Sequence, residues 1–151
     1  MPRVERAWRA LRALSWRDRV LVAEAWCMLP LVALGLRLVG FRRVRTWAAN
    51  RPERGTRHDL DAALTIARLV RGADAWSAAR PRCLTRSLVL VRLLRRAGLA
   101  ADLRIGVDRQ SPDFAAHAWV EHEGVALAEP EDVAARYATF DGPLDARDLI
   151  S

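Results

Sequence analysis

Cysteine is scarce in this sequence, and lysine is absent. Only two of the 151 residues are cysteines, Cys27 and Cys83, which are too few and too far apart to form a disulfide framework. The N-terminus shows no short apolar core before a small-residue cleavage site, so we expect no secretory signal. A reducing compartment fits best, and the sequence therefore predicts a cytoplasmic protein.

Long apolar runs without charge are also missing. The strongest membrane candidate, residues 20–41, is interrupted by Glu24, Pro30 and Arg37. A spanning helix normally needs about 20 predominantly apolar residues. We therefore expect no membrane span, and we expect this segment to be buried or to face a partner.

All 25 basic residues are arginines, and they are unevenly distributed. Residues 1–57 carry thirteen arginines against four acids, whereas residues 105–151 carry three against ten. Guanidinium groups suit bidentate contacts with carboxylates, so an acidic peptide or protein partner fits the basic half. Charge alone is a weak signal for nucleic acid, which we do not expect as a partner. A basic binding module without catalysis stays open as an alternative.

The patterns predict helices first and an antiparallel sheet afterwards, which is an α+β fold. The first 50 residues have helical patterns. Ser15 and Asp18 have the spacing of a capping box, which predicts a helix start. Pro30 predicts a kink in this helix, and Gly40 predicts its end. A second helix is expected from about His58 to Gly72. A third, almost wholly apolar one runs over 84–97, directly after Cys83. Strands are expected at 103–107, 115–122 and 125–129, followed by a tail, 131–151, with a short helix.

Cys83 is the first candidate for chemistry. It opens the predicted third helix, where free backbone N–H groups and the helix dipole stabilise a thiolate. The same N–H groups can hold the oxyanion of a tetrahedral intermediate. The alternative is a small core residue, which is how free cysteines commonly occur.

His117 and Glu129 complete the constellation. If residues 122–124 form a three-residue hairpin loop with Gly124 in the left-handed conformation, Glu121 pairs with Val125 and His117 lies opposite Glu129. Opposed side chains have Cβ atoms about 5 Å apart, within reach of a carboxylate–imidazole hydrogen bond. A two-residue loop would instead bring Glu129 opposite Ala118. The alternatives are a core histidine and a solvated acid.

A helix-start cysteine, a strand histidine and a neighbouring acid form the Cys-His-acid arrangement of papain-like chemistry. The sequence resembles the lasso-peptide B2 leader peptidases of the transglutaminase-like superfamily. The resemblance is carried by Cys83-Leu84-Thr85-Arg86-Ser87-Leu88, residues 93–99, Ile105-Gly106-Val107, residues 114–121 around His117, and Gly124. It implies Cys83 as nucleophile and His117 as base, with Glu129 where the family usually has Asp.

The resemblance further implies a transglutaminase-like, papain-like catalytic core over residues 58–151. A helical N-terminal subdomain over residues 1–57 would cover this core or dock a partner, and we expect the two parts to form one compact domain. Such proteins cut the leader from a ribosomally made precursor peptide. A separate B1-type leader-binding recognition protein would be a partner, together with an ATP-dependent lasso cyclase. Arg82, Arg86 and Trp119 are candidates for substrate binding. Acyl transfer to an amine by the same triad stays open as an alternative.

The remaining residues predict no cofactor. No clustered His or Cys spacing suits zinc, so no metal is expected, and no Gly-rich phosphate loop is present. Cys27 is expected in a helix as a core residue, and His58 and His122 are expected to be solvated.

Overall fold

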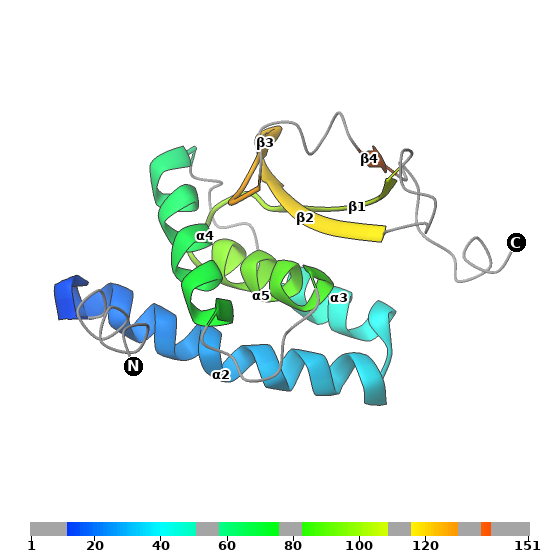
Figure 1. The fold of residues 1–151 in the computed structure, drawn as a ribbon, viewed down its shortest axis with the longest axis horizontal. Coiled ribbons are helices and arrows are strands. Elements are labelled where there is room, and N and C mark those ends of the chain that lie inside the picture. The colour runs from blue at the N-terminus through cyan, green and yellow to red at the C-terminus, as the bar shows by residue number, and fades with distance from the viewer. Residues whose placement is uncertain (1–11, 51–57, 76–82, 109–115, 130–136, 140–151) are drawn as a thin grey trace, which may run out of the picture.

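The computed structural model describes residues 12–50, 58–75, 83–108, 116–129 and 137–139. Within these ranges, four helices precede four strands along the chain (Figure 1). The helices are α2 (Trp16–Leu38), α3 (Phe41–Ala49), α4 (Leu60–Ala75) and α5 (Cys83–Arg96). The strands are β1 (Asp102–Asp108), β2 (Ala116–His122), β3 (Val125–Ala126) and β4 (Tyr137–Thr139).

The N-terminus of α2 is where the capping box predicted it. The Ser15 hydroxyl accepts from the backbone N–H of Asp18 at 3.2 Å and donates to its carboxylate at 2.7 Å. The helix runs through Pro30, which stands in its interior, and ends at Leu38. Gly40, with φ of 82°, then separates α2 from α3. The predicted end near Gly40 is therefore close to the observed one.

The helices that follow begin and end by local rules, with one exception. Asp59 caps α4 through a 3.0 Å bond from the N–H of Ala62. Gly98, with φ of 79°, closes α5 in a Schellman motif, in which Leu99 N–H donates to the Leu94 carbonyl. Gly72 neither ends nor breaks α4, contrary to expectation, because one interior glycine costs only about 1 kcal/mol and packing can offset that.

The strands form one antiparallel sheet in the order β3-β2-β1-β4. The hairpin between β2 and β3 has a two-residue loop, so His122 pairs with Val125 and Glu121 with Ala126. Glu123 and Gly124 both have positive φ, at 52° and 81°, as the tight two-residue turns of hairpins require. The expected three-residue loop and its pairing of Glu121 with Val125 are therefore wrong. The third strand ends at Ala126 rather than at 129.

The tail contains a strand that sequence reasoning missed. Tyr137–Thr139 forms β4, which pairs with β1 on the edge opposite β2, with Gly106 opposite Thr139. Apart from these three residues, the stretch 131–151, in which a short helix was expected, lies outside the described residues. Three residues are too few for period-two alternation to stand out from a loop.

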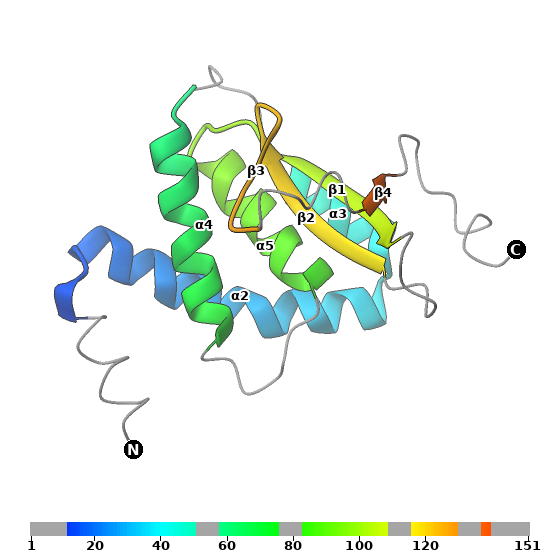
Figure 2. The same cartoon turned by 45° about the horizontal axis from the view of Figure 1, so that its top comes forward.

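The apolar core joins the helices to the sheet. Helix α5 lies between α2 and the sheet in both views of the ribbon (Figures 1 and 2). Its residues Leu88, Val89 and Leu94 are fully buried in one cluster with Leu29 of α2 and Val120 of β2. The predicted α+β fold, a helical N-terminal half on a small antiparallel sheet, is confirmed.

Candidate active site

Cys83 is the first residue of α5, as the sequence predicted. It is a free thiol with intermediate burial, so it stands apart from the closed core that the rest of α5 enters. The N–H groups in the first turn of a helix lack partners within that helix. The thiol therefore begins a helix at a point where an anion is stabilised.

His117 lies near the beginning of β2 and takes part in an aromatic cluster. Its ring stacks on Trp119, with centroids 6.1 Å apart and an angle of 17° between the planes. Tyr137 of β4 lies against it at 5.1 Å. Gly106, which pairs with His117, has no side chain to separate strands β2 and β4 on this face. The two rings restrict the orientation of the imidazole.

Glu129 reaches His117 by a route different from the expected one. Its Oε2 lies 3.1 Å from Nε2 of His117. The observed register would place residue 129 opposite Ala118, but Ala128 adopts a left-handed φ of 57° and turns the chain. Arg71 of α4 holds this turn by donating to the Ala128 carbonyl at 2.8 Å. The contact between His117 and Glu129 was expected from direct pairing in the sheet. It is instead made from a turn that follows a shorter strand β3.

Two helices fix the carboxylate of Glu129. Arg86 of α5 donates to its Oε1 at 2.9 Å, so its two oxygens have different partners. The same guanidinium lies 3.4 Å from the carboxylate of Asp74 at the end of α4. All three side chains are at most one-quarter exposed, and in such surroundings a charge-assisted bond is stronger than it is in water.

The beginning of α5 lies beside the His117 end of β2. Cys83, Arg86 and Ser87 are spaced i, i+3 and i+4 and therefore share one side of the helix. Ser87 donates to the carbonyl of Ala118 at 2.9 Å, next to His117 in sequence. Arg86 contacts Glu129, the hydrogen-bond partner of His117. Both cross-links come from within about one turn of Cys83.

The observed contacts assign a role to each imidazole nitrogen. Because a carboxylate oxygen accepts, the contact with Glu129 favours the tautomer that carries its proton on Nε2 and leaves Nδ1 as the basic nitrogen. A carboxylate at Nε2 also stabilises the imidazolium that forms when the thiol ionises. The arrangement can therefore serve acyl chemistry that begins with a thiolate.

The residues suggested for substrate binding occupy different settings. Trp119 is 1% exposed, and its indole donates to Glu121 at 3.0 Å, a carboxylate that Arg104 also binds. The described contacts of Arg86 are with Asp74 and Glu129, and Arg82 lies outside the described residues. Substrate binding by these three residues stays a prediction. Sequence reasoning missed Asp74 and Tyr137, since neither has a spacing that points to the site.

The other histidines behave differently from each other. His58 is exposed and pairs with Glu123 in the hairpin turn. His122 is fully buried, and its Nδ1 lies 2.7 Å from the Ala100 carbonyl, so the expectation that it is solvated is wrong. The two-residue loop keeps it in β2, on the core-facing side with Val120. Cys27 is exposed on α2, which also contradicts its predicted place in the core. Within the described ranges, no group of three or more His, Cys, Asp or Glu residues could hold a metal ion.

Comparison with known proteins identifies a family. A family model described as the transglutaminase-like superfamily matches residues 25–140, which include Cys83, His117 and Glu129. No curated protein and no solved structure matches the chain. The match covers most of the sequence and spans every described element from within α2 to β4. With its α+β fold and half-buried helix-start cysteine, this chain belongs to the transglutaminase-like superfamily.

Proposed function

We propose that this protein is a cysteine peptidase that removes the leader from a ribosomally made lasso-peptide precursor. Membership of a superfamily whose members are usually cysteine-based enzymes supports catalysis. The resemblance of residues 83–88 and 114–121 to lasso-peptide leader peptidases supports the substrate class. The bond between His117 and Glu129, fixed by an arginine on the helix that Cys83 begins, is the observation that carries the proposal.

The reaction proceeds through a thioester. His117 takes the proton of Cys83 at Nδ1, and the thiolate attacks the carbonyl carbon at the leader–core junction. The oxyanion of the tetrahedral intermediate is held by N–H groups at the beginning of α5. His117 then gives its proton to the leaving amine, which frees the N-terminus of the core peptide. Water, deprotonated by His117, hydrolyses the thioester and releases the leader with a carboxylate end.

A separate leader-binding protein and the ATP-dependent cyclase are partners in this proposal. The leader-binding protein presents the precursor, and the cyclase joins the freed amine to a side-chain carboxylate. Neither nucleic acid nor a cofactor takes part, and the proposed location is the cytoplasm.

The test combines the full-length protein, a candidate precursor and the leader-binding partner, with fragments detected by mass spectrometry. We expect a leader fragment with a free carboxylate, and we expect Cys83→Ala to abolish it while partner binding persists. Unchanged cleavage by Cys83→Ala would refute the enzyme. A leader fragment carrying an added amine in place of the carboxylate would instead identify acyl transfer.

A further inference from the structure

Helix α2 has a second apolar face that the described part of the chain leaves exposed. One face enters the core through Val22, Ala25, Leu29 and Val32. The opposite face, which we call the outer stripe, is exposed and contains, at spacings of three, four and seven, Trp16, Val20, Ala23, Cys27, Leu34 and Leu38. No charged residue lies within it, although Trp16 and Leu38 are 76% and 73% exposed. A helix that is apolar all round is normally covered on all sides.

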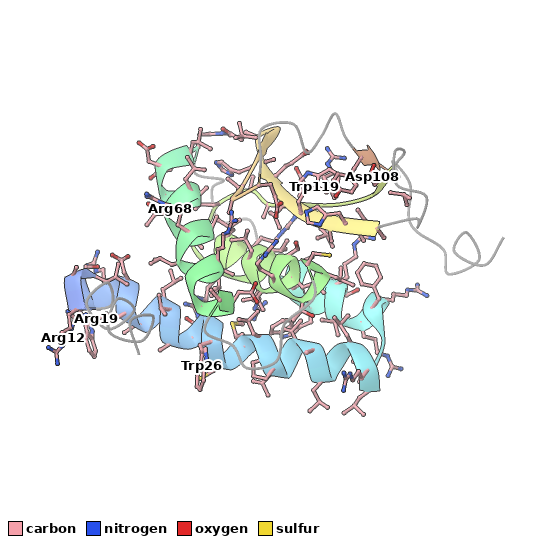
Figure 3. All side chains as sticks on the ribbon, viewed as in Figure 1. Arg12, Arg19, Trp26, Arg68, Asp108 and Trp119 are labelled. Carbon is pink, nitrogen blue, oxygen red and sulfur yellow. The ribbon has the colours of Figure 1, made fainter. Side chains whose placement is uncertain are left out.

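The outer stripe is long and lies far from the candidate active site. A helix of 23 residues extends about 35 Å at the usual rise. In Figure 1, α2 forms one edge of the molecule, with α5 between it and the sheet. Trp26, which borders the outer stripe and is 52% exposed, points away from the body of the protein in Figure 3. Length and composition would allow α2 to cross a membrane, and 22% of its most apolar window is buried.

Most of the charges around the outer stripe are basic. Arg17 stands at its beginning and Arg37 near its end, and α3 adds Arg42, Arg43 and Arg45. These five arginines are exposed and form no ion pair with any residue in the described part of the chain. Arginines elsewhere, such as Arg86 and Arg96, do pair with acids. The two acids of α2 are engaged, since Asp18 contacts Ser15 and Glu24 binds Arg96.

A groove between α2 and α3 adjoins the outer stripe. It encloses about 510 Å³ and is lined by apolar groups, including Met28, Leu31, Val39 and Trp47, with Arg43 as the one charged residue. Gly35 lies in its wall, where an added Cβ would come within 3.3 Å of the Val44 side chain. An apolar recess beside a guanidinium suits an acyl chain with an anionic head group.

We propose that the outer stripe and the arginines of α3 bind the surface of an anionic lipid bilayer, with α2 lying in the plane of the interface. Amphipathic helices of this type place apolar side chains about 5–10 Å into the boundary, while basic residues attract anionic lipids. Exposed tryptophans, here Trp16, Trp26 and Trp47, are enriched at that depth. The proposal is independent of the peptidase function and requires no span.

The charges argue against a second copy of this chain, and the uniform outer stripe argues against a protein helix. Two copies of this chain would bring arginine against arginine in a parallel or an antiparallel pairing, because both ends of α2 are basic. A protein helix that docks in one register normally uses polar groups to specify it. The outer stripe contains no such group over its whole length, whereas a fluid bilayer needs no register.

The test measures co-sedimentation of the full-length protein with vesicles of phosphatidylcholine alone and mixed with phosphatidylglycerol. We expect binding to the mixed vesicles only, weakened by high salt. Leu34→Glu with Leu38→Glu should abolish it. Replacing Arg42, Arg43 and Arg45 by Gln should weaken it roughly five-fold for each arginine, about a hundred-fold together. The matched control is Leu60→Glu, at an exposed leucine of α4, which should bind as the wild type does.

Three outcomes would overturn the proposal. They are no sedimentation with either vesicle, equal binding to both, or full binding by the Leu34→Glu, Leu38→Glu variant. If the protein does not bind vesicles, and the leader-binding partner no longer stimulates precursor cleavage by this variant, the outer stripe is a protein interface instead.

Discussion

At the scale of single residues, the length of the Glu129 side chain matters. The observed register does not pair residue 129 with His117, and the left-handed turn at Ala128 redirects the chain. The extra methylene, compared with the aspartate that the resemblance leads one to expect, gives the carboxylate reach to two partners, His117 and Arg86. The longer residue is therefore suited to the shorter strand.

Replacing Glu129 by Gln should lower kcat for precursor cleavage on the order of 10²–10⁴-fold. The amide keeps the shape but lacks the charge that stabilises an imidazolium and orients its ring. Single-turnover cleavage followed by mass spectrometry measures the effect, with thermal unfolding as the control for folding. A fully active Gln variant would remove Glu129 from the catalytic machinery.

Arg86→Gln should reduce stability as well as activity. It leaves the carboxylates of Asp74 and Glu129 without their shared cation in a part-buried site. We expect the free energy of unfolding in urea to fall by about 1–3 kcal/mol. Arg68→Gln, at an exposed arginine of α4 that bonds Thr65, serves as control and should change it by less than about 0.5 kcal/mol. Equal stability of the two variants would contradict the role given to Arg86.

At the scale of elements, two glycines differ only in backbone conformation. A Cβ at either Gly72 or Gly124 would meet no atom within 4 Å, but Gly124 has φ of 81°. Gly72→Ala in α4 should therefore stabilise the protein by about 0.5–1 kcal/mol. Gly124→Ala in the hairpin should destabilise it by about 1–2 kcal/mol. Denaturant unfolding measures both, and a shift of the same sign for both would contradict the assigned turn.

At the scale of the whole molecule, the N-terminal helices and the sheet share one core. Leu29 of α2 is 1% exposed and belongs to the cluster that contains Leu88 and Val120. Leu29→Ala should lower the free energy of unfolding by about 2–5 kcal/mol. Leu34→Ala, the same change at a 52% exposed site of the same helix, should have little effect.

The shared core also predicts how the Leu29→Ala variant unfolds. Far-ultraviolet circular dichroism, which follows the helices, and near-ultraviolet signals, which follow the aromatic rings, should give coincident transitions. Two separated transitions would mean that the helical part and the sheet fold independently.

The sequence by itself determined the features that depend on neighbours in the chain. The Ser15 cap, the beginning of α5 at Cys83 and the Gly98 end of α5 follow from local hydrogen bonding and from the φ that glycine adopts easily. The two long strands follow from alternation, which sequence displays directly. Cys83 and His117 were identifiable as candidates because Cys83 lies at a predicted helix start and His117 lies in a predicted strand.

The tertiary structure decided which distant groups meet. The hairpin register depended on one residue of loop length, and a shift of one residue moves every side chain of the strand to the other face. Two helices support the contact between Glu129 and His117, because Arg71 binds the turn after β3 and Arg86 binds the Glu129 carboxylate. Tyr137 and Asp74 reach the candidate active site through packing between segments that are far apart in the chain. No local sequence pattern encodes such packing. The exposure of the outer stripe could not be predicted from the sequence either, because the sequence does not show whether another segment covers an apolar residue.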